Sequence, residues 1–115
     1  MQRGDIVLVD LDPVIGSEAS KTRPVVLVSN DEVNLTAARL GRGVVTVVPV
    51  TSNLERVYAF QVRLPAAATG LGRDSKAQAE QIRSVSVRRI GSKLGQVPGS
   101  LMTELDEALR LHLAL

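Results

Sequence analysis

Short runs of β-branched residues recur along most of this chain, and they restrict its fold more than any other feature. Residues 6–11, 25–29 and 44–50 are apolar runs that begin or end near Gly, Pro, Asn or Asp. Such runs predict short, largely buried strands separated by turns. Residues 75–79 and 85–97 are expected to form further short strands. The repeated pattern indicates a fold that is mostly β.

Two segments between these strands have patterns of their own. Residues 58–64 alternate, so the expected strand has one apolar face made by Tyr58, Phe60, Val62 and Leu64. Residues 30–43 are expected to make a short helical turn that ends at the glycines. Pro49 should lie at a strand end or a bulge, because proline cannot donate to a central ladder.

The period changes at the end of the chain. Pro98-Gly99 interrupts the strand pattern, and Ser100 is a good N-cap for a helix. Leu101, Leu105, Ala108 and Leu109 then recur at helical spacing and should pack on the sheet. Leu111 falls on the polar side of this helix and hints at a partner surface. Many short strands followed by one terminal helix predict a small, mostly antiparallel β-barrel.

Composition excludes several classes of protein. The chain has no cysteine, which excludes disulfides and thiolate metal sites, and a single histidine, His112, cannot build a histidine zinc site. We therefore expect no metal and no other cofactor. No apolar run approaches the roughly 20 residues of a membrane span. The first residues lack a signal-peptide core, which favours a cytoplasmic protein.

Positive charge is concentrated in residues 73–93, although the net charge is only +2. The basic residues there are Arg73, Lys76, Arg83, Arg88, Arg89 and Lys93. A basic surface suits polyanions, and the alternative is a solvated face without a ligand. Tyr58 and Phe60 are the only aromatic residues. The chain therefore lacks the several exposed rings that a base-stacking platform needs.

Three polar groups stand beside the expected strands. They are Lys21 and Arg23 before strand 25–29, Thr51 and Ser52 after strand 44–50, and Gln81 and Arg83 in the link between the last strands. The planar guanidinium of arginine matches phosphate oxygens, and hydroxyls can hold a phosphate or a ribose. Together these groups predict phosphodiester binding.

Each group also has a purely structural interpretation. Arg23 could make a surface salt bridge, and Thr51-Ser52 could be an ordinary turn. The segment around Gln81 could be a solvated link. None of the three signals is specific by itself.

In combination the motifs carry a resemblance. The ordered set "RGDI", "GSE", "KTRPV", "VPVTS" and "EQIR" closely resembles the MazF/PemK family of toxin endoribonucleases, and the match extends over nearly the whole chain. The resemblance implies a single toxin domain over residues 1–115 with a compact SH3-like barrel. It also implies a homodimer, an antitoxin partner, and metal-free cleavage of single-stranded RNA at short sequence motifs. Leu8 departs from the family, where many members carry tryptophan, and this concerns core packing rather than chemistry.

The same resemblance assigns roles to the candidate residues. Arg23 and Thr51 correspond to the family's catalytic pair. Ser17, Glu18, Ser52 and Gln81 lie in segments that match RNA-contacting loops. Lys21 and Arg83 are expected to bind phosphates through their charge.

A ribonuclease can use the ribose 2′-hydroxyl as an internal nucleophile. The protein must then stabilise the charge that develops on the phosphoryl oxygens, and the guanidinium of Arg23, stiffened by Pro24, suits that task. A guanidinium keeps its proton at neutral pH, so Arg23 is a poor base. The proton acceptor stays open, with Glu18 as the alternative nearest in sequence.

Two other functions are compatible with such a barrel. CcdB-type toxins have a similar barrel but bind DNA gyrase without hydrolysis, and fold alone does not separate them from nucleases. A plain nucleic-acid-binding barrel is supported only by the basic segment. The joint presence of "KTRPV" and "VPVTS" favours the ribonuclease.

Overall fold

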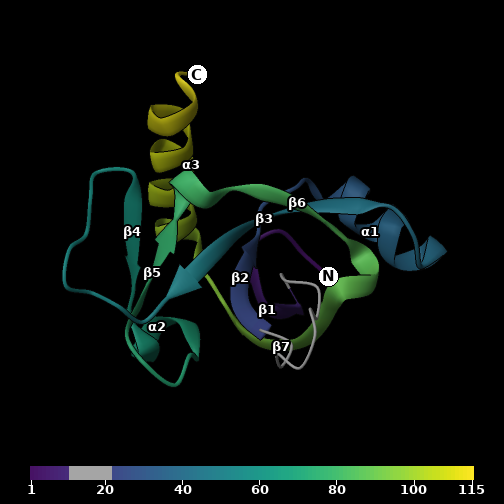
Figure 1. Ribbon diagram of the computed structural model, residues 1–115, viewed down its shortest axis with the longest axis horizontal. Helices are drawn as coiled ribbons and strands as arrows, with labels where there is room; N and C mark the ends of the chain where they lie inside the picture. The colour runs from purple at the N-terminus through teal and green to yellow at the C-terminus, as the bar shows by residue number, and fades with distance from the viewer. Residues whose placement is uncertain (11–21) are drawn as a thin grey trace, which may run out of the picture.

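A computed structural model describes residues 1–10 and 22–115 (Figure 1). The strands are β1 (Asp5–Asp10), β2 (Thr22–Leu27), β3 (Val44–Thr51), β4 (Gln61–Leu64), β5 (Ser75–Gln78), β6 (Arg83–Ser86) and β7 (Ile90–Gln96). The helices are α1 (Asp31–Leu40), α2 (Ala66–Thr69) and α3 (Gly99–Leu113), with single 3₁₀ turns η1 (Ala79–Gln81) and η2 (Val87–Arg89). The fold that the sequence predicted, mostly β with a C-terminal helix, is confirmed.

The seven strands form one antiparallel sheet with the order β4-β5-β3-β2-β1-β7, and β6 pairs with β3 beside β5. The sheet is strongly curved, so that β7 and β6 run around β1 and β2 (Figure 1). Within the described ranges, no pairing joins the two ends of this order. The predicted barrel is therefore an open, curved sheet.

The central strands are buried on both faces, which explains their continuous β-branched sequences. In β2, Val26 belongs to a core cluster that includes Leu105 of α3, whereas Val25 belongs to a second cluster with Val47 of β3. Successive side chains of a strand point to opposite faces, so one unbroken apolar run supplies both clusters. The two cores hold the middle of the sheet rigid between them.

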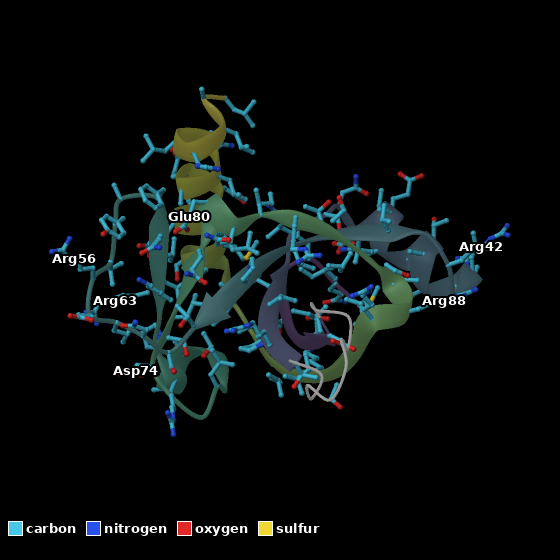
Figure 2. All side chains as sticks on the ribbon, in the orientation of Figure 1. Arg42, Arg56, Arg63, Asp74, Glu80 and Arg88 are labelled. Carbon is cyan, nitrogen blue, oxygen red and sulfur yellow. The ribbon has the colours of Figure 1, made fainter. Side chains whose placement is uncertain are left out.

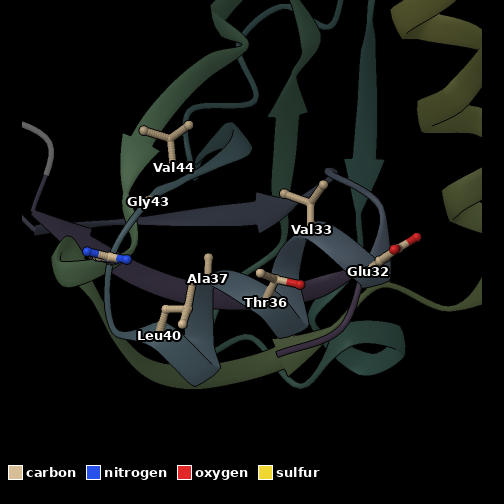
Figure 3. Close-up of a pocket in the computed structure, with 8 residues that line it drawn as sticks. Glu32, Val33, Thr36, Ala37, Leu40, Gly43 and Val44 are labelled. Atoms are coloured by element: carbon tan, nitrogen blue, oxygen red, sulfur yellow. The ribbon is translucent and has the colours of Figure 1, made fainter.

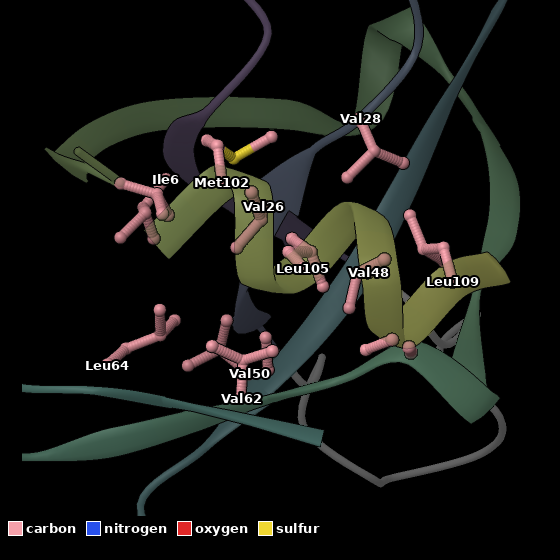
Figure 4. Packing of buried hydrophobic residues seen from close by; sticks show 14 residues of the cluster. Ile6, Val26, Val28, Val48, Val50, Val62, Leu64, Met102, Leu105 and Leu109 are labelled. Carbon is pink, nitrogen blue, oxygen red and sulfur yellow. The ribbon is translucent and has the colours of Figure 1, made fainter. Parts of the chain in front are cut away.

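Helix α3 covers one face of the sheet, as its spacing predicted. Leu105 is fully buried and lies among valines of β2, β3 and β4 (Figure 4). Ser100 is not the N-cap, because Pro98 precedes the first helical residue and makes no side-chain cap. Arg3 pairs with Asp106 at 2.5 Å and so ties the first residues to this helix. Leu111 is 59% exposed, as expected from its position.

Several elements differ from the sequence-based expectation, including residues 85–97, which the 3₁₀ turn η2 divides between β6 and β7. The segment after Ser29 forms a full ten-residue helix, α1, because Asn30 caps its start and Gly41 ends it with φ 64°. Strand β4 begins only at Gln61, so Tyr58 and Phe60 lie outside it. Pro49 lies inside β3, between the residues that pair with β6 and those that pair with β5. A missing N–H costs little where a ladder changes partner.

In residues 1–10 and 22–115 there is no helix with both the length and the apolar character needed to cross a membrane.

Candidate nucleic-acid interface

The pairing of β2 with β3 brings the predicted catalytic pair together. Val25 lies opposite Pro49, and Leu27 lies opposite Val47. Two residues further along, β2 reaches Arg23 and β3 reaches Thr51, and both residues line the same hollow. Side chains two residues apart in a strand share a face, so Arg23 and Thr51 lie on the same side of the sheet as the paired residues Val25 and Pro49. Arg23 therefore belongs to the strand itself rather than to the loop before it.

Thr51 also begins the turn that leaves β3. Its Oγ1 accepts a hydrogen bond from the backbone N–H of Asn53 at 3.2 Å, and Asn53 Oδ1 accepts one from the N–H of Glu55 at 3.1 Å. The structural interpretation of this segment as a turn is thus correct. It does not compete with a functional role, because the accepting hydroxyl keeps its own hydrogen free to donate to a ligand.

A hollow of about 340 Å³ opens beside this pair. Its lining combines polar residues with apolar ones; the polar residues are Thr22, Arg23, Thr51, Ser52, Arg73 and Ser75, and the others are Pro24, Val50, Leu71, Gly72 and Leu94. Pockets that combine an apolar lining with a few polar groups are typical of small-ligand sites. A nucleotide has both kinds of surface.

A second hollow, of about 300 Å³, also has Arg23 in its lining. It is lined by Arg23, Pro49, Gln78, Gln81 and Arg83. Arg83 reaches it because β6 pairs with β3, with Arg83 opposite Val47. Arg23 thus borders both hollows, and the structure brings Thr51, Ser52, Gln81 and Arg83 around it. Strands from distant parts of the chain supply these residues.

The charge of this region is positive. Arg23, Arg73 and Arg83 line the two hollows, and no carboxylate belongs to the described lining of either. The ion pairs within the described residues involve other cations, so the proposed surface salt bridge of Arg23 has no partner there. Three guanidinium groups distributed over these two hollows attract a polyanion.

The basic segment 73–93 is divided by the fold. Four of its cations contact protein acceptors: Lys76 with the Arg56 carbonyl, Arg88 with that of Gly41, Arg89 with that of Asp10, and Lys93 with the Asp5 carboxylate. Lys76 is only 7% exposed, so it serves the structure rather than a ligand. Arg73 and Arg83 remain at the hollows. The expected basic surface is therefore much narrower than the sequence suggested.

Ser17, Glu18 and Lys21 lie outside the described residues, so their positions relative to Arg23 stay predictions. The sequence reasoning missed Gln78, Leu94 and Arg73 as parts of the lining. Arg73 could have been predicted, because it belongs to the basic segment 73–93. No sequence pattern indicated Gln78 or Leu94, because each looked like an ordinary residue of a strand.

A third concavity lies beside α1, at the end of the molecule away from α3 (Figures 1 and 3). Val33, Ala37, Leu40 and Val44 make it apolar, and Glu32 and Arg42 are its only charged residues in the described chain. None of the predicted site residues lines it. A mostly apolar lining with one acidic and one basic residue does not suit a polyanion.

Comparisons with known proteins identify the family of this chain. The model of the family described as PemK-like, MazF-like toxin of type II toxin–antitoxin system matches residues 2–113. The chain is 60% identical over 115 residues to Endoribonuclease MazF9 of Mycobacterium tuberculosis, covering 100% of this chain and 98% of that protein. The solved structure of Mycobacterium tuberculosis toxin MazF-mt6 has a TM-score of 0.77 at 26% identity, covering 96% of this chain and 97% of that one.

A second solved structure is an endoribonuclease in complex with its cognate antitoxin from mycobacterial species. Its TM-score is 0.77 at 23% identity, with 100% of this chain and 96% of that chain covered, so it shares the fold. The family match extends over nearly the whole chain. The chain belongs to the family of PemK-like, MazF-like toxins of type II toxin–antitoxin systems.

Proposed function

We propose that this toxin is an endoribonuclease that cleaves single-stranded RNA at short sequence motifs, without a metal ion. One observation carries the proposal: three arginines border two adjoining hollows whose described lining contains no carboxylate. The relative with 60% identity is an endoribonuclease, so the alternative of a gyrase-binding toxin has no support from it. A cytoplasmic location is part of the proposal, because that compartment holds the substrate.

The proposed chemistry is attack by the ribose 2′-oxygen on the adjacent phosphorus. The 2′-hydroxyl gives up its proton, the bond from phosphorus to the 5′-oxygen breaks, and that oxygen takes up a proton. The products are a 2′,3′-cyclic phosphate and a 5′-hydroxyl. Arg23 stabilises the negative charge on the phosphoryl oxygens, and Thr51 donates its free hydroxyl hydrogen to the same group. Glu18 is the proposed proton acceptor.

The remaining candidates would hold the RNA. Ser52 lines one hollow, and Gln81 and Arg83 line the other. The RNA chain would therefore pass across Arg23 from one hollow to the other. Amide groups such as that of Gln81 can read base edges, whereas arginine binds phosphate. Ser17 and Lys21 are proposed to complete this surface.

The test is incubation of the purified protein with a long single-stranded RNA in excess EDTA, followed by mapping of the cut sites. Cleavage should persist in EDTA, because the described residues contain no group of three or more potential metal-ligating side chains. A DNA copy of the same sequence should stay intact, since it lacks the 2′-hydroxyl. Activity that chelation abolishes and magnesium restores would refute the metal-free mechanism.

We further propose two protein partners, a second copy of this chain and an antitoxin. The family description names an antitoxin system, and the exposed Leu111 supports a partner surface on α3. A site lined by Arg23, Arg73 and Arg83 that holds phosphates will also attract carboxylates. An acidic, initially disordered antitoxin segment could therefore occupy the RNA site, with part of the binding energy offset by ordering.

These partners predict a measurable competition. The protein should have twice its 12.3 kDa chain mass in light scattering. A non-cleavable DNA analogue of the target should be displaced by the antitoxin's C-terminal peptide, and more salt should weaken both complexes. A monomeric mass with full activity would argue against the dimer. Binding of both ligands at once, each with unchanged affinity, would argue against occlusion.

A further inference from the structure

The first hollow contains an arginine that the family motifs do not include. Arg73 lines it together with Arg23, Thr51 and Ser52. It comes from the loop between α2 and β5, whereas Arg23 and Thr51 come from β2 and β3. Arg73 is exposed and forms no ion pair with any described carboxylate, although Asp74 is its neighbour in sequence.

Asp74 is directed elsewhere by the local structure. Its Oδ1 accepts a hydrogen bond at 2.8 Å from the backbone N–H of Ala66, at the start of α2. The same loop is closed by Thr69, whose Oγ1 donates to the Pro65 carbonyl at 2.9 Å and accepts from the Leu71 N–H at 3.3 Å. Ser75 Oγ donates to the carbonyl of Arg73 at 3.0 Å. The backbone that carries Arg73 is therefore held from both sides.

The loop is also fixed against the sheet. Leu71 packs on the core cluster beneath α3. On the other side, a Cβ atom built on Gly95 of β7 would collide with the carbonyl oxygen of Thr69, so the two backbones are in close contact there. A surface arginine on a loop held this firmly presents its guanidinium with little loss of backbone entropy.

The lining of this hollow suits one nucleotide unit. Leu71 and Leu94 offer an apolar surface against which a base can lie, and Arg73 provides a cation in the same lining. Arg23 borders the same hollow and is assigned to the scissile phosphate. A second arginine in this hollow is then available for a neighbouring phosphate of the same strand.

We propose that Arg73 is a second phosphate-binding residue of the RNA site, which holds the phosphate next to the scissile one. The inference rests on the proposed function, because it concerns the same RNA strand. Arg73 does not touch the reacting atoms, so its role is in binding and not in the chemical step. Its contribution should be independent of base sequence, as for other phosphate contacts.

The experiment uses a 2′-O-methyl oligoribonucleotide that covers a cut site mapped on the long RNA. Its affinity is measured over a series of salt concentrations for the native protein, Arg73→Gln, Arg73→Lys and Arg42→Gln. Arg42 is the matched control, because it is exposed and lines neither hollow. Figure 2 shows Arg42 and Asp74, the neighbour of Arg73, toward opposite ends of the molecule.

Arg73→Gln should lower the slope of log K against log salt by about 0.7, the value for one phosphate of a single strand. At fixed salt its affinity should fall on the order of tenfold. Arg73→Lys should keep the slope, and Arg42→Gln should leave both quantities unchanged. In cleavage assays Arg73→Gln should raise KM and leave kcat near the native value.

Two outcomes would overturn the inference. One is an unchanged slope in Arg73→Gln while the native protein cleaves RNA and binds the oligonucleotide, which would leave the proposed function intact. The other is an equal loss in Arg73→Gln and Arg42→Gln, which would indicate only general surface charge. Absence of RNA cleavage by the native protein would instead contradict the proposed function itself. Thermal unfolding of each variant verifies that the fold is unchanged.

Discussion

Replacing Arg23 by alanine should reduce the rate of RNA cleavage by about 10²–10³-fold, because one preorganised donor to the phosphoryl oxygens is lost. The loss should appear in kcat, since charge on those oxygens increases only as the transition state forms. Arg23 is exposed and has no ion-pair partner among the described residues, so the unfolding transition should stay close to that of the native protein. Single-turnover cleavage and thermal unfolding measure the two effects.

Two comparisons make this result specific. Thr51→Ala should lose less activity, because it removes one hydroxyl contact and no charge. Arg42→Ala removes the same charge from a site that lines neither hollow, and it should cleave at the native rate. Near-native turnover in Arg23→Ala would show that the catalytic assignment is wrong. Unfolding of that variant would point to a structural role for Arg23.

Replacing Leu105 by alanine should lower the free energy of unfolding by about 2–5 kcal/mol. Leu105 is fully buried where α3 packs on β2, β3 and β4, so truncation leaves a cavity that the surrounding rigid sheet cannot fill (Figure 4). Denaturant-induced unfolding, followed by circular dichroism, measures the change. The midpoint should move to lower denaturant at constant slope.

The matched control for this prediction is Leu35→Ala. Leu35 is on α1 and is 56% exposed, so its truncation should change the unfolding free energy by less than about 0.5 kcal/mol. Equal losses in the two variants would mean that helix propensity, and not the burial of Leu105 between α3 and the sheet, determines the loss of stability. An unchanged midpoint in Leu105→Ala would contradict the packing of α3 on the sheet.

Local sequence patterns were sufficient to predict most elements of this protein. The β-branched runs around Val26 and Val48 indicated buried strands because a short apolar run can be recognised from neighbouring residues alone. The stripe containing Leu105 indicated the terminal helix for the same reason. The motifs around Arg23 and Thr51 also identified the family, and the family match confirmed it.

The local patterns placed two element boundaries wrongly, each for a physical reason. Ser100 has the chemistry of an N-cap, yet the observed cap position is Pro98, two residues earlier, because Pro98 already ends the preceding segment in an extended conformation. The alternation from Tyr58 to Leu64 is a strand pattern, but only the part from Gln61 onward has β5 beside it. A periodic pattern becomes a strand only where a partner strand accepts its hydrogen bonds.

The tertiary structure alone decided which polar residues share a site. Arg23 and Thr51 line one hollow because β2 pairs with β3, and Arg83 lines the second hollow with Arg23 because β6 pairs with β3. It also separated cations that look alike in the sequence: Lys76 is buried against the Arg56 carbonyl, whereas Arg73 lines the hollow beside Arg23. Burial and proximity depend on strands supplied from distant parts of the chain, and no local window of residues contains that information.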